Sequence, residues 1–464
     1  MPAVLFRYTN DLRIDAHRGL QAAAALGPVL PVFIIDRAME ATFARSPRRA
    51  AFVLRAVDAL SGDFRRIGQS LIIRRGPAGA SLRRLARAVD AQTVVWTARY
   101  DPASQHADAR LQAELEEAGL RVCSIHDSPV VAPEALPGPA GGGFRSFAAY
   151  VPAWMQAEVD ESPTADRWLA CDLHAEPRPQ DWDATEPALS VPDVEHPDAA
   201  VDAFLGGPIL QYSARSKTPA VAGTSHLGPL LSIGRIAAHD VAARVRARMR
   251  DPLLLAEERA SLAEFLRSLA RRDFFSQLAW FSPLIGDEAY QEKMRDFPFA
   301  TTHPHLDAWR TGMTGFPLVD AGMRQLRATG WMHPFVRRVV ASFVCFDLGV
   351  DWRIGRDEFA RYAFDDEPVS ATGNWQWAAG VGADLAQFPR IFNPTKQRAR
   401  YDPDGQYVRR WIPELATELL ASHESEQLGL PLFGEQTYPA PIHSHERAAQ
   451  AFLARYRAHR AAKG

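Results

Sequence analysis

Short apolar runs alternate with amphipathic stretches along the first 130 residues. Strands are predicted at residues 4–6, 29–35, 70–73, 93–96 and 121–125. Helices with outward-facing arginines and glutamates are predicted at residues 47–60, 79–90 and 104–119. Strands that alternate with helices of this length indicate a parallel, doubly wound sheet. The N-terminal part is therefore expected to be an α/β domain.

Helical periodicity dominates from residue 201 onward. Pro334 suits the first position of a helix, and apolar side chains follow it at helical spacing. These side chains are Phe335, Val336, Val339, Val340, Phe343 and Val344. Residues 132–200 are rich in proline, glycine, alanine and acidic residues, which is typical of a surface connection. We expect an α/β domain at 1–131, a linker at 132–200 and an all-α domain at 201–464.

Composition sets limits on the class of protein. The 464 residues suffice for two or three domains, and 47% hydrophobic with 23% charged residues is typical of a globular protein. No apolar run approaches the roughly eighteen residues that a bilayer requires, and the N-terminus starts with a strand-like run. Three scattered cysteines favour neither a disulfide framework nor an iron–sulfur cluster. We expect a monomeric, cytoplasmic protein without a metal site.

Charge alone does not point to nucleic acid. A net charge of −2 gives no global attraction to DNA, so a DNA site would have to be a local basic patch. Residues 390–411 form one candidate, with six basic side chains against two acidic ones. The six are Arg390, Lys396, Arg398, Arg400, Arg409 and Arg410. A charge run is more often a solvated face than a binding site.

Two loops have the polar groups of ligand sites. FRYTNDLRIDAH follows the first strand, at the sheet edge where α/β folds bind ligands. The turn at 223–228, GTSHLG, presents amides and hydroxyls that suit an anion, although such turns also occur without ligands. No GxGxxG or GxxxxGK[ST] motif occurs in the first domain, which gives a dinucleotide or P-loop site little support.

The stretch 331–377 combines dense aromatic residues with charges. Its tryptophans are Trp331, Trp352, Trp375 and Trp377. Clustered aromatics are more often core than cofactor contacts. Arg337 would lie on a partly apolar helix face and needs a partner, because an unpaired buried charge is costly. Asp365 is a candidate partner, either in a structural ion pair or in a pair that clamps a charged cofactor.

Three long strings resemble the photolyase/cryptochrome family. They are TGFPLVDAGMRQLRATGWMHPFVRRVVASF at 314–343, GNWQWAAGVG at 373–382 and RIFNPTKQRARYDPDGQYVRRWIPEL at 390–415. FRYTNDLRIDAHRGL also resembles the opening motif of the family, and FRSFAAYVPAW resembles a family segment that would pack part of the linker against the domains. The resemblance implies an α/β N-terminal domain, which often holds a second light-harvesting chromophore, and an all-α domain that binds FAD.

The resemblance implies a set of FAD-binding residues. The turn at 223–228 looks like the pyrophosphate cradle, and Arg272 looks like the arginine near the FAD phosphates. Arg337 and Asp365 match an ion pair beside the flavin ring. At Ala371, the position that faces the reactive flavin nitrogen, a methyl group can neither donate nor accept a hydrogen bond. The implied cofactor set is Tyr212, Thr224, Ser225, Leu227, Arg272, Arg337, Asp365, Glu367 and Ala371.

Trp375 and Trp352 match the first two members of the family's tryptophan electron chain. The third position falls on Phe299, whose benzene ring gives up an electron far less readily than indole. The sequence therefore predicts either poor photoreduction or a chain that ends on another aromatic residue. The implied catalytic set is Trp375, Trp352, Arg337, Asp365 and His333.

The implied lesion pocket departs from the well-known dimer photolyases at five positions. These are Ser268, Arg271, Pro334, Phe335 and Arg338. The motif also lacks the histidine pair of (6-4) photolyases. Arginine planes stack on bases and bind phosphate, so Arg271 and Arg338 suit DNA contact. The resemblance adds Trp377, Arg398 and Arg400 to this set.

Three functions follow from these expectations. The first is a blue-light-driven, FAD-dependent photolyase that binds UV-damaged DNA and repairs flipped-out pyrimidine dimers, cyclobutane dimers rather than (6-4) products. The second is a cryptochrome photoreceptor without repair activity, which the five departures favour. The third is a light-independent flavoprotein or single-strand binder, in which the tryptophans are only core.

Overall fold

The computed structural model describes residues 1–139, 141–159, 164–171, 173, 192–383, 389–415 and 438–463. Within these ranges the chain forms two compact units that interleave along the sequence. Unit 1 comprises Met1–Gln211, Ser225–Gly286 and Phe364–Ser370, and unit 2 comprises Tyr212–Thr224, Asp287–Ala363 and Ala371–Gly464. The expected domain limits at residues 131 and 200 follow sequence order and remain a prediction.

Unit 1 is built on a parallel five-stranded sheet with strand order β3-β2-β1-β4-β5. The strands are β1 (Ala3–Tyr8), β2 (Val29–Ile35), β3 (Ile72–Arg75), β4 (Ala91–Thr97) and β5 (Arg121–Ile125). β1 and β2 are buried along their whole length, as expected of strands covered on both faces. β3 starts two residues later than predicted, at Ile72, where its pairing with Val32 begins. The predicted doubly wound parallel sheet is confirmed.

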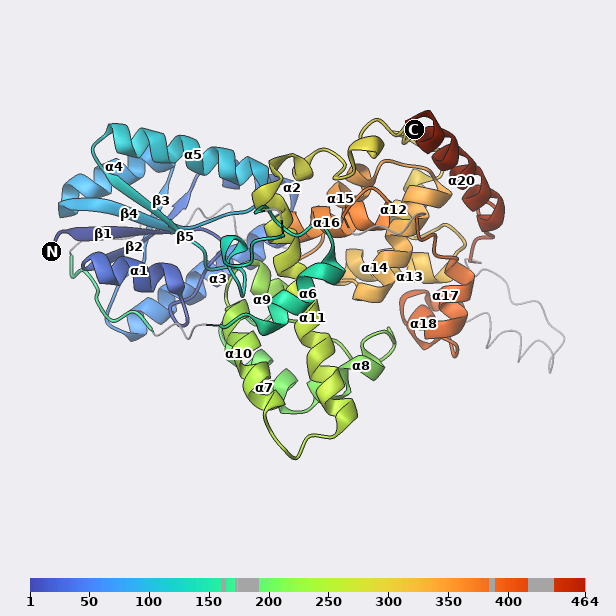
Figure 1. Ribbon diagram of the computed structural model, residues 1–464, viewed down its shortest axis with the longest axis horizontal. Helices are drawn as coiled ribbons and strands as arrows, with labels where there is room; N and C mark the ends of the chain where they lie inside the picture. Colours follow the sequence, from blue (N-terminus) through green and yellow to red (C-terminus); the bar gives the residue numbers. More distant parts are fainter. Residues whose placement is uncertain are drawn as a thin grey trace. The chain divides into compact units, whose positions relative to one another are not determined.

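Helices cover both faces of this sheet. They are α1 (Arg18–Leu26), α2 (Arg37–Arg45), α3 (Pro47–Arg66), α4 (Ala78–Val89) and α5 (Pro102–Glu117). Figure 1 shows α4 and α5 over one face and α1 over the other. The sequence prediction misses α1 and α2, which are short and capped by the side chain before them. His17 accepts the N–H of Leu20, and Asp36 accepts the N–H of Met39.

The rest of unit 1 is helical in its described residues. It contains α6 (Phe147–Gln156), α7 (Pro197–Gly206), α9 (Gly228–Ser232), α10 (Ala238–Met249) and α11 (Ala256–Phe281), with 3-10 turns at Pro133–Ala135, Pro208–Gln211 and Pro283–Gly286. α6 lies inside the predicted linker and buries Phe147, Tyr150 and Trp154. The Trp154 indole N–H donates to Asp273 of α11 at 2.8 Å. Part of the predicted linker therefore packs inside unit 1, against α11.

Unit 2 is also helical where it is described. Its helices are α8 (Tyr212–Arg215), α12 (Leu306–Thr311), α13 (Pro317–Thr329), α14 (Pro334–Ser342), α15 (Trp352–Ala360), α17 (Pro394–Tyr401), α18 (Gln406–Trp411) and α20 (His445–Ala462). A 3-10 turn forms at Glu292–Met294, and α16 (Pro368–Ala378) begins in unit 1 and continues in unit 2. The helix predicted from Pro334 is confirmed, with its predicted apolar side chains buried.

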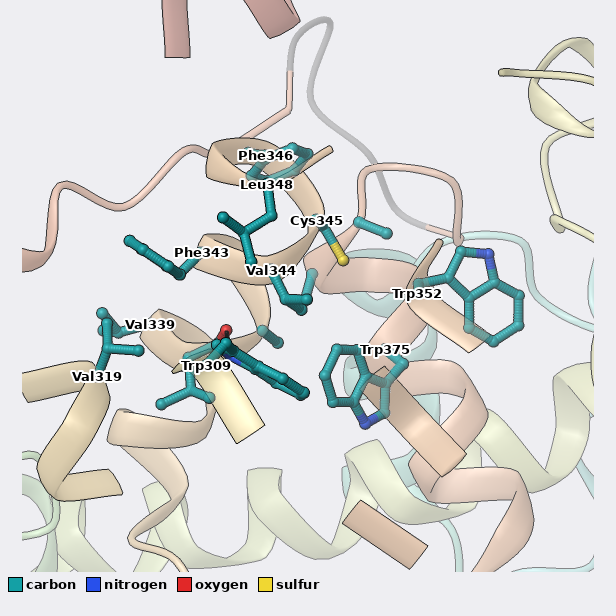
Figure 2. Packing of buried hydrophobic residues seen from close by; sticks show 14 of the residues in the cluster. Trp309, Val319, Val339, Phe343, Val344, Cys345, Phe346, Leu348, Trp352 and Trp375 are labelled. Carbon is teal, nitrogen blue, oxygen red and sulfur yellow. Dashed lines mark hydrogen bonds between the residues drawn. The ribbon is translucent and has the colours of Figure 1, made fainter. Parts of the chain in front are cut away.

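The core of unit 2 surrounds α14 and the π-helical turn that continues it, η6 (Phe343–Asp347). Figure 2 shows Phe343, Phe346, Trp352 and Trp375 in one packed cluster. π-helical turns are rare and often occur at functional sites.

Two buried carboxylates anchor the chain after residue 438. Asp347 Oδ1 lies 2.6 Å from His445 Nδ1 and 3.3 Å from His443 Nε2. Asp320 Oδ2 accepts a hydrogen bond from the Tyr438 hydroxyl. These contacts hold α20 and the segment that leads into it against the core of unit 2. No described helix combines the length and the apolar character that a bilayer crossing requires.

Candidate functional site

The turn before α9 lies against an acidic turn of unit 1. Ser225 Oγ accepts the N–H of Leu227 at 3.3 Å, which is the geometry of a serine turn. A methyl group built on Gly228 would lie 3.2 Å from Asp365 Oδ2. Gly228 therefore lets the two turns approach closely. A larger side chain at position 228 would crowd the Asp365 carboxylate.

A buried arginine holds this acidic turn in place. Arg49 Nη1 donates to the carbonyl oxygen of Phe364 at 2.5 Å. Burial lowers the pKa of the Arg49 guanidinium, and nearby carboxylates that include Asp365 and Glu367 oppose the shift. Glu367 Oε2 accepts the N–H of Ser370 at 2.9 Å, in the first turn of α16. A carboxylate at a helix N-terminus is favourable, so Glu367 has a structural role beside its predicted cofactor role.

α11 carries three of the predicted site residues. Ser268 is exposed, and its hydroxyl donates to the backbone one turn earlier. The Arg271 guanidinium stands over the Phe147 ring, with Cζ 4.1 Å from the centroid. Arg272 donates to Ser128, at 2.7 Å to the carbonyl oxygen and 2.6 Å to the hydroxyl. Two hydrogen bonds thus fix Arg272, and its contact with FAD phosphates remains a prediction.

Asp273 follows Arg272 and is completely buried. Its Oδ2 accepts hydrogen bonds from Trp154 Nε1 at 2.8 Å and from the N–H of Val131 at 3.1 Å. Its Oδ1 accepts none within the described part of the chain. Burial raises the pKa of this carboxyl to about 6, against the smaller lowering effect of its hydrogen bonds. The sequence reasoning missed Asp273, although a lone acid on an apolar helix face was a visible signal.

A small polar cavity of about 10 Å³ lies beside Arg272 and the predicted ligand loop. It is lined by Asn10, Arg13 and Asp127 among others. Arg13 Nη2 donates to Asp127 Oδ2 at 2.7 Å, so the polar lining is largely paired. Small-molecule sites usually measure about 300–1,000 Å³. This cavity is too small for a second chromophore, whose binding therefore stays a prediction.

α14 positions several predicted residues of unit 2. Pro334 is exposed at its first position, and the buried His333 ring accepts the N–H of Phe335 at 3.2 Å. Arg337 Nε donates to the carbonyl oxygen of Met332 at 2.8 Å. Arg337 belongs to unit 2 and Asp365 to unit 1, and their ion pair stays a prediction.

Two adjacent aromatic rings, one from α14 and one from α17, lie between two guanidinium groups. Arg338 Cζ lies 5.3 Å from the centroid of Phe335, whose ring lies 4.0 Å from that of Tyr401. Arg400 Cζ lies 5.2 Å from the Tyr401 centroid. We call Arg338, Phe335, Tyr401 and Arg400 the α14–α17 run. Both arginines at its ends are exposed, Phe335 is buried, and Tyr401 is half-buried.

Two further predicted DNA residues lie in the same unit. Trp377 is half-buried, and Arg390 Cζ lies 5.9 Å from its ring centroid. Arg398 is half-buried on α17. The structure thus places Trp377 beside a basic residue of the predicted patch.

Gly355 lets Trp375 pack on α15, the helix that begins with Trp352. A methyl group built on Gly355 would lie 2.3 Å from Trp375 Cη2 and Cζ3, so the Trp375 ring rests on α15. Trp352 opens α15 one turn earlier. The Phe359 ring meets that of Trp375 edge-on, with centroids 5.0 Å apart. The tight approach of Trp375 to α15 requires glycine at 355.

Arg353 and Arg356 are site residues that sequence reasoning missed. Both guanidinium groups stand over the Trp352 ring. They follow Trp352 by one and four positions, and the i,i+4 spacing was a signal that a helix would bring Arg356 to the indole.

The residues of each unit are compatible with FAD. In unit 1, Gly228 has no side chain at the end of the turn at 225–228, and the Ser225 hydroxyl accepts the N–H of Leu227. In unit 2, Tyr212, Thr224 and Ala371 are half-buried and thus reachable by a ligand. Among the described residues, no group of three acidic, cysteine or histidine side chains is arranged to hold a metal ion.

The comparisons with known proteins agree along nearly the whole chain. The family model "DNA photolyase" matches residues 3–166, and "FAD binding domain of DNA photolyase" matches residues 265–458. A deoxyribodipyrimidine photo-lyase of Halobacterium salinarum is 34% identical over 97% of this chain and 98% of its own length. Residues 265–458 therefore belong to an FAD-binding domain of the photolyase type.

Solved structures give the same result. A class III photolyase from Agrobacterium tumefaciens is 30% identical with a TM-score of 0.86, covering 99% of this chain and 98% of that one. A cryptochrome from Synechocystis sp. is 25% identical with a TM-score of 0.85, covering 98% and 99%. The protein described here is a member of the DNA photolyase and cryptochrome family.

Proposed function

We propose that this chain is a blue-light-driven, FAD-dependent DNA photolyase that repairs pyrimidine dimers in UV-damaged DNA. Cyclobutane dimers are the proposed substrate, because the motif at 331–338 lacks the histidine pair that (6-4) photolyases carry. The likeness to deoxyribodipyrimidine photo-lyases over the full length of both chains supports the enzyme class.

The observation that carries the proposal is the α14–α17 run. Arg338 and Arg400 are exposed at its ends, and each is held by an aromatic ring beneath it. Exposed guanidinium groups bind phosphate, and the planes of arginine and tyrosine stack on bases. Such a surface suits a DNA strand that has been distorted around a lesion.

FAD, when bound, supplies the electron that splits the dimer. The residues of this chain have supporting roles. Ser225 and Leu227 would hold the pyrophosphate, and Asp365 would fix the flavin ring, with Arg337 as its proposed partner. Arg271, stacked on Phe147, would add positive charge at the lesion pocket.

A cryptochrome photoreceptor is the second candidate. Five substitutions in the implied lesion pocket favour it, as does the likeness to a Synechocystis cryptochrome. A signalling protein without a DNA ligand would have no evident use for the exposed arginines of the α14–α17 run, which is why repair is the first candidate.

The test is a repair assay under blue light with chemically reduced, FAD-loaded protein. Oligonucleotides with one cyclobutane dimer or one (6-4) product are compared, single- and double-stranded. We expect repair of the cyclobutane dimer alone. Repair of the (6-4) product would correct the substrate, and repair of neither lesion would favour the cryptochrome. If well-folded purified protein released no FAD when it was denatured, FAD would not be its cofactor.

A further inference from the structure

Two guanidinium groups stand over one buried indole in unit 2. Arg353 Cζ is 4.7 Å and Arg356 Cζ is 5.3 Å from the centroid of the Trp352 ring. The Trp352 ring is 1% exposed, whereas the side chains of Arg353 and Arg356 are 32% and 20% exposed, so water screens their charges only from the outer side. Trp352 is also the first residue of α15, where the helix dipole adds positive potential.

The two arginines favour the neutral ring over the oxidised ring. A cation over neutral indole is attracted by the negative face of the π-system. Removing one electron makes the ring positive, so this attraction is replaced by charge repulsion. The repulsion is stronger in a buried site than in water, because the local dielectric constant is lower. Oxidation of Trp352 is therefore more difficult than that of an indole without such neighbours.

Nearby carboxylates offset only part of this field. Arg353 pairs with Asp351 at 2.9 Å, and Arg356 pairs with Asp357 at 3.0 Å. The Asp357 side chain is 67% exposed, so water screens its charge. Asp351 also accepts the N–H of Arg353 at the start of α15, which shares its charge with the helix terminus.

Trp375 has different surroundings, although it rests on the same helix. Its ring contacts the backbone at Gly355 and meets Phe359 edge-on. Within the described residues, no guanidinium stands over it. An electron vacancy therefore has a lower free energy on Trp375 than the same vacancy would have on Trp352.

We propose that Arg353 and Arg356 hold Trp352 neutral and thereby confine an electron vacancy to Trp375. This proposal rests on the proposed function and on the electron chain that the resemblance implies, in which Trp375 would give one electron to the flavin in the light. The step outward would move one electron from Trp352 to oxidised Trp375. Trp375 would become neutral and Trp352 a radical cation, with no bond made or broken and no proton moved.

The consequence concerns two light-driven reactions, which are repair by the reduced protein and photoreduction of the oxidised protein. A vacancy that stays on Trp375 is refilled by recombination, so light reduces the oxidised protein inefficiently. Phe299 at the next position acts in the same direction, since its ring is a poor electron donor. Repair by protein that is already reduced does not require oxidation of Trp352. The arginines thus favour repair over light-driven signalling from the oxidised state.

The first measurement tests the contact in the dark. The full-length FAD-bound protein is labelled with 5-fluorotryptophan, and the Trp352 resonance is assigned with Trp352→Phe. Arg356→Gln should move that fluorine resonance more than Arg356→Lys, which keeps the charge. An unmoved Trp352 resonance in Arg356→Gln would overturn the contact and with it the proposal.

The second measurement follows the indole radical after a blue flash. In Arg353→Gln/Arg356→Gln, the yield of long-lived indole radical should rise about threefold to tenfold. The matched Arg353→Lys/Arg356→Lys protein keeps both charges and should stay near the wild-type yield. Asp357→Asn removes the counter-charge of Arg356 and should lower the yield. An unchanged yield in the glutamine variant, or an equal rise in the lysine variant, overturns the proposal.

Failure of this proposal is separable from failure of the proposed function. Chemically reduced wild-type protein is assayed for dimer repair beside the flash experiment. Repair with an unchanged radical yield in the glutamine variant leaves the photolyase proposal intact and removes the arginine effect. Absence of repair with a raised yield supports the arginine effect and removes the photolyase proposal.

Discussion

Two of the arginine–aromatic groups in the described part of unit 2 differ in how far their arginines are exposed: Arg338 and Arg400 are exposed, whereas Arg353 and Arg356 are half-buried. In the α14–α17 run, the aromatic pair lies beneath Arg338 and Arg400, whose guanidinium groups reach solvent. At the start of α15, Arg353 and Arg356 bracket an indole that is itself out of contact with water. Under our two proposals, the same type of contact presents charge to DNA in one place and imposes charge on a ring in the other.

The difference shows that burial decides what a charge does. An exposed guanidinium on a ring loses side-chain freedom and stays available for phosphate. A guanidinium over a buried ring acts on the electronic state of that ring, because the field is weakly screened. Four predictions test this comparison and the effect of burial on which it rests.

Gly355→Val should have the largest effect. Its new side chain would overlap the Trp375 ring, since even a methyl group would lie 2.3 Å from two of its carbons. Overpacking of this kind costs about 3 kcal/mol or more, because neither α15 nor the indole can move freely. Urea denaturation and the near-UV circular dichroism of the indoles check this.

Gly62→Ala is the matched control for that glycine. Gly62 lies in α3, and the nearest atom to an added methyl group is Arg65 Nη2 at 3.9 Å. Alanine should stabilise the helix there by about 0.5–1 kcal/mol. If both substitutions changed stability in the same direction, the tight contact between Gly355 and Trp375 would not be the cause.

Asp273→Asn extends the comparison to a buried carboxylate. Burial raises the folded-state pKa of Asp273 from 3.8 to about 6. Between these values the folded protein binds more protons than the unfolded chain, so Asp273 makes stability fall as pH rises from about 4 to 6. The loss is complete above pH 6 and amounts to at most about 3 kcal/mol, at 1.36 kcal/mol per pKa unit.

Asparagine does not titrate, so it removes this pH dependence. The free energy of unfolding is measured for both proteins from pH 4 to 8, and the difference between them cancels other groups. Asp273→Asn should gain stability relative to wild type across the window. A difference that is flat between pH 4 and 7 would mean that the Asp273 carboxyl titrates normally.

Sequence patterns predicted the elements better than the contacts between them. β2 and the helix from Pro334 follow from apolar periodicity alone, since burial of one face or both dictates the pattern. β5 was also predicted, although its residues are half-buried or exposed. α1 and α2 were missed because each is short, although Asp36 is a standard N-cap residue. The interleaved compact units have no local signature, because they depend on which distant segments pack together.

The site residues show the same limit. Phe335 and Tyr401 are far apart in sequence, and nothing near either one predicts a ring contact at 4.0 Å. The role of Gly355 depends on a tryptophan twenty positions later, so a helical glycine alone gave no sign of it. Resemblance supplied Trp352 and Trp375, but their charged surroundings required the structure.

Arg338→Ala and Arg400→Ala test the exposed half of the comparison. Each should weaken binding of dimer-containing DNA about fivefold to tenfold and reduce the slope of log K against log salt by about one. Stability should hardly change, because both guanidinium groups are exposed. Fluorescence anisotropy at several salt concentrations checks this.

Two other arginines serve as controls for this result. Arg447 is exposed at the start of α20, and Arg447→Ala should leave affinity and slope unchanged. Arg356→Gln should also leave the salt slope unchanged, since its guanidinium lies over an indole. An equal loss of slope in all four proteins would mean that DNA senses net charge and not the α14–α17 run.

Phe299→Trp should have the smallest effect. The loop at 299 lies beside the start of α15, because Ala300 N–H donates to Gly349 and Ala300 carbonyl oxygen accepts from Asp351, both at 2.9 Å. An indole at 299 would thus become the neighbour of Trp352 that the family pattern expects. Yet the vacancy must reach Trp352 first, and Arg353 and Arg356 oppose that step. We expect the rate of photoreduction to rise only about twofold in the wild-type background, which corresponds to a few tenths of a kcal/mol.

In the background of Arg353→Gln/Arg356→Gln the same substitution should raise the rate much more, because the two changes act on successive steps of one route. The measurement is the rate of flavin reduction under continuous blue light with an external reductant. A large gain from Phe299→Trp alone would show that the vacancy already reaches Trp352 freely, and the contrast between the two arginine groups would then be one of position only.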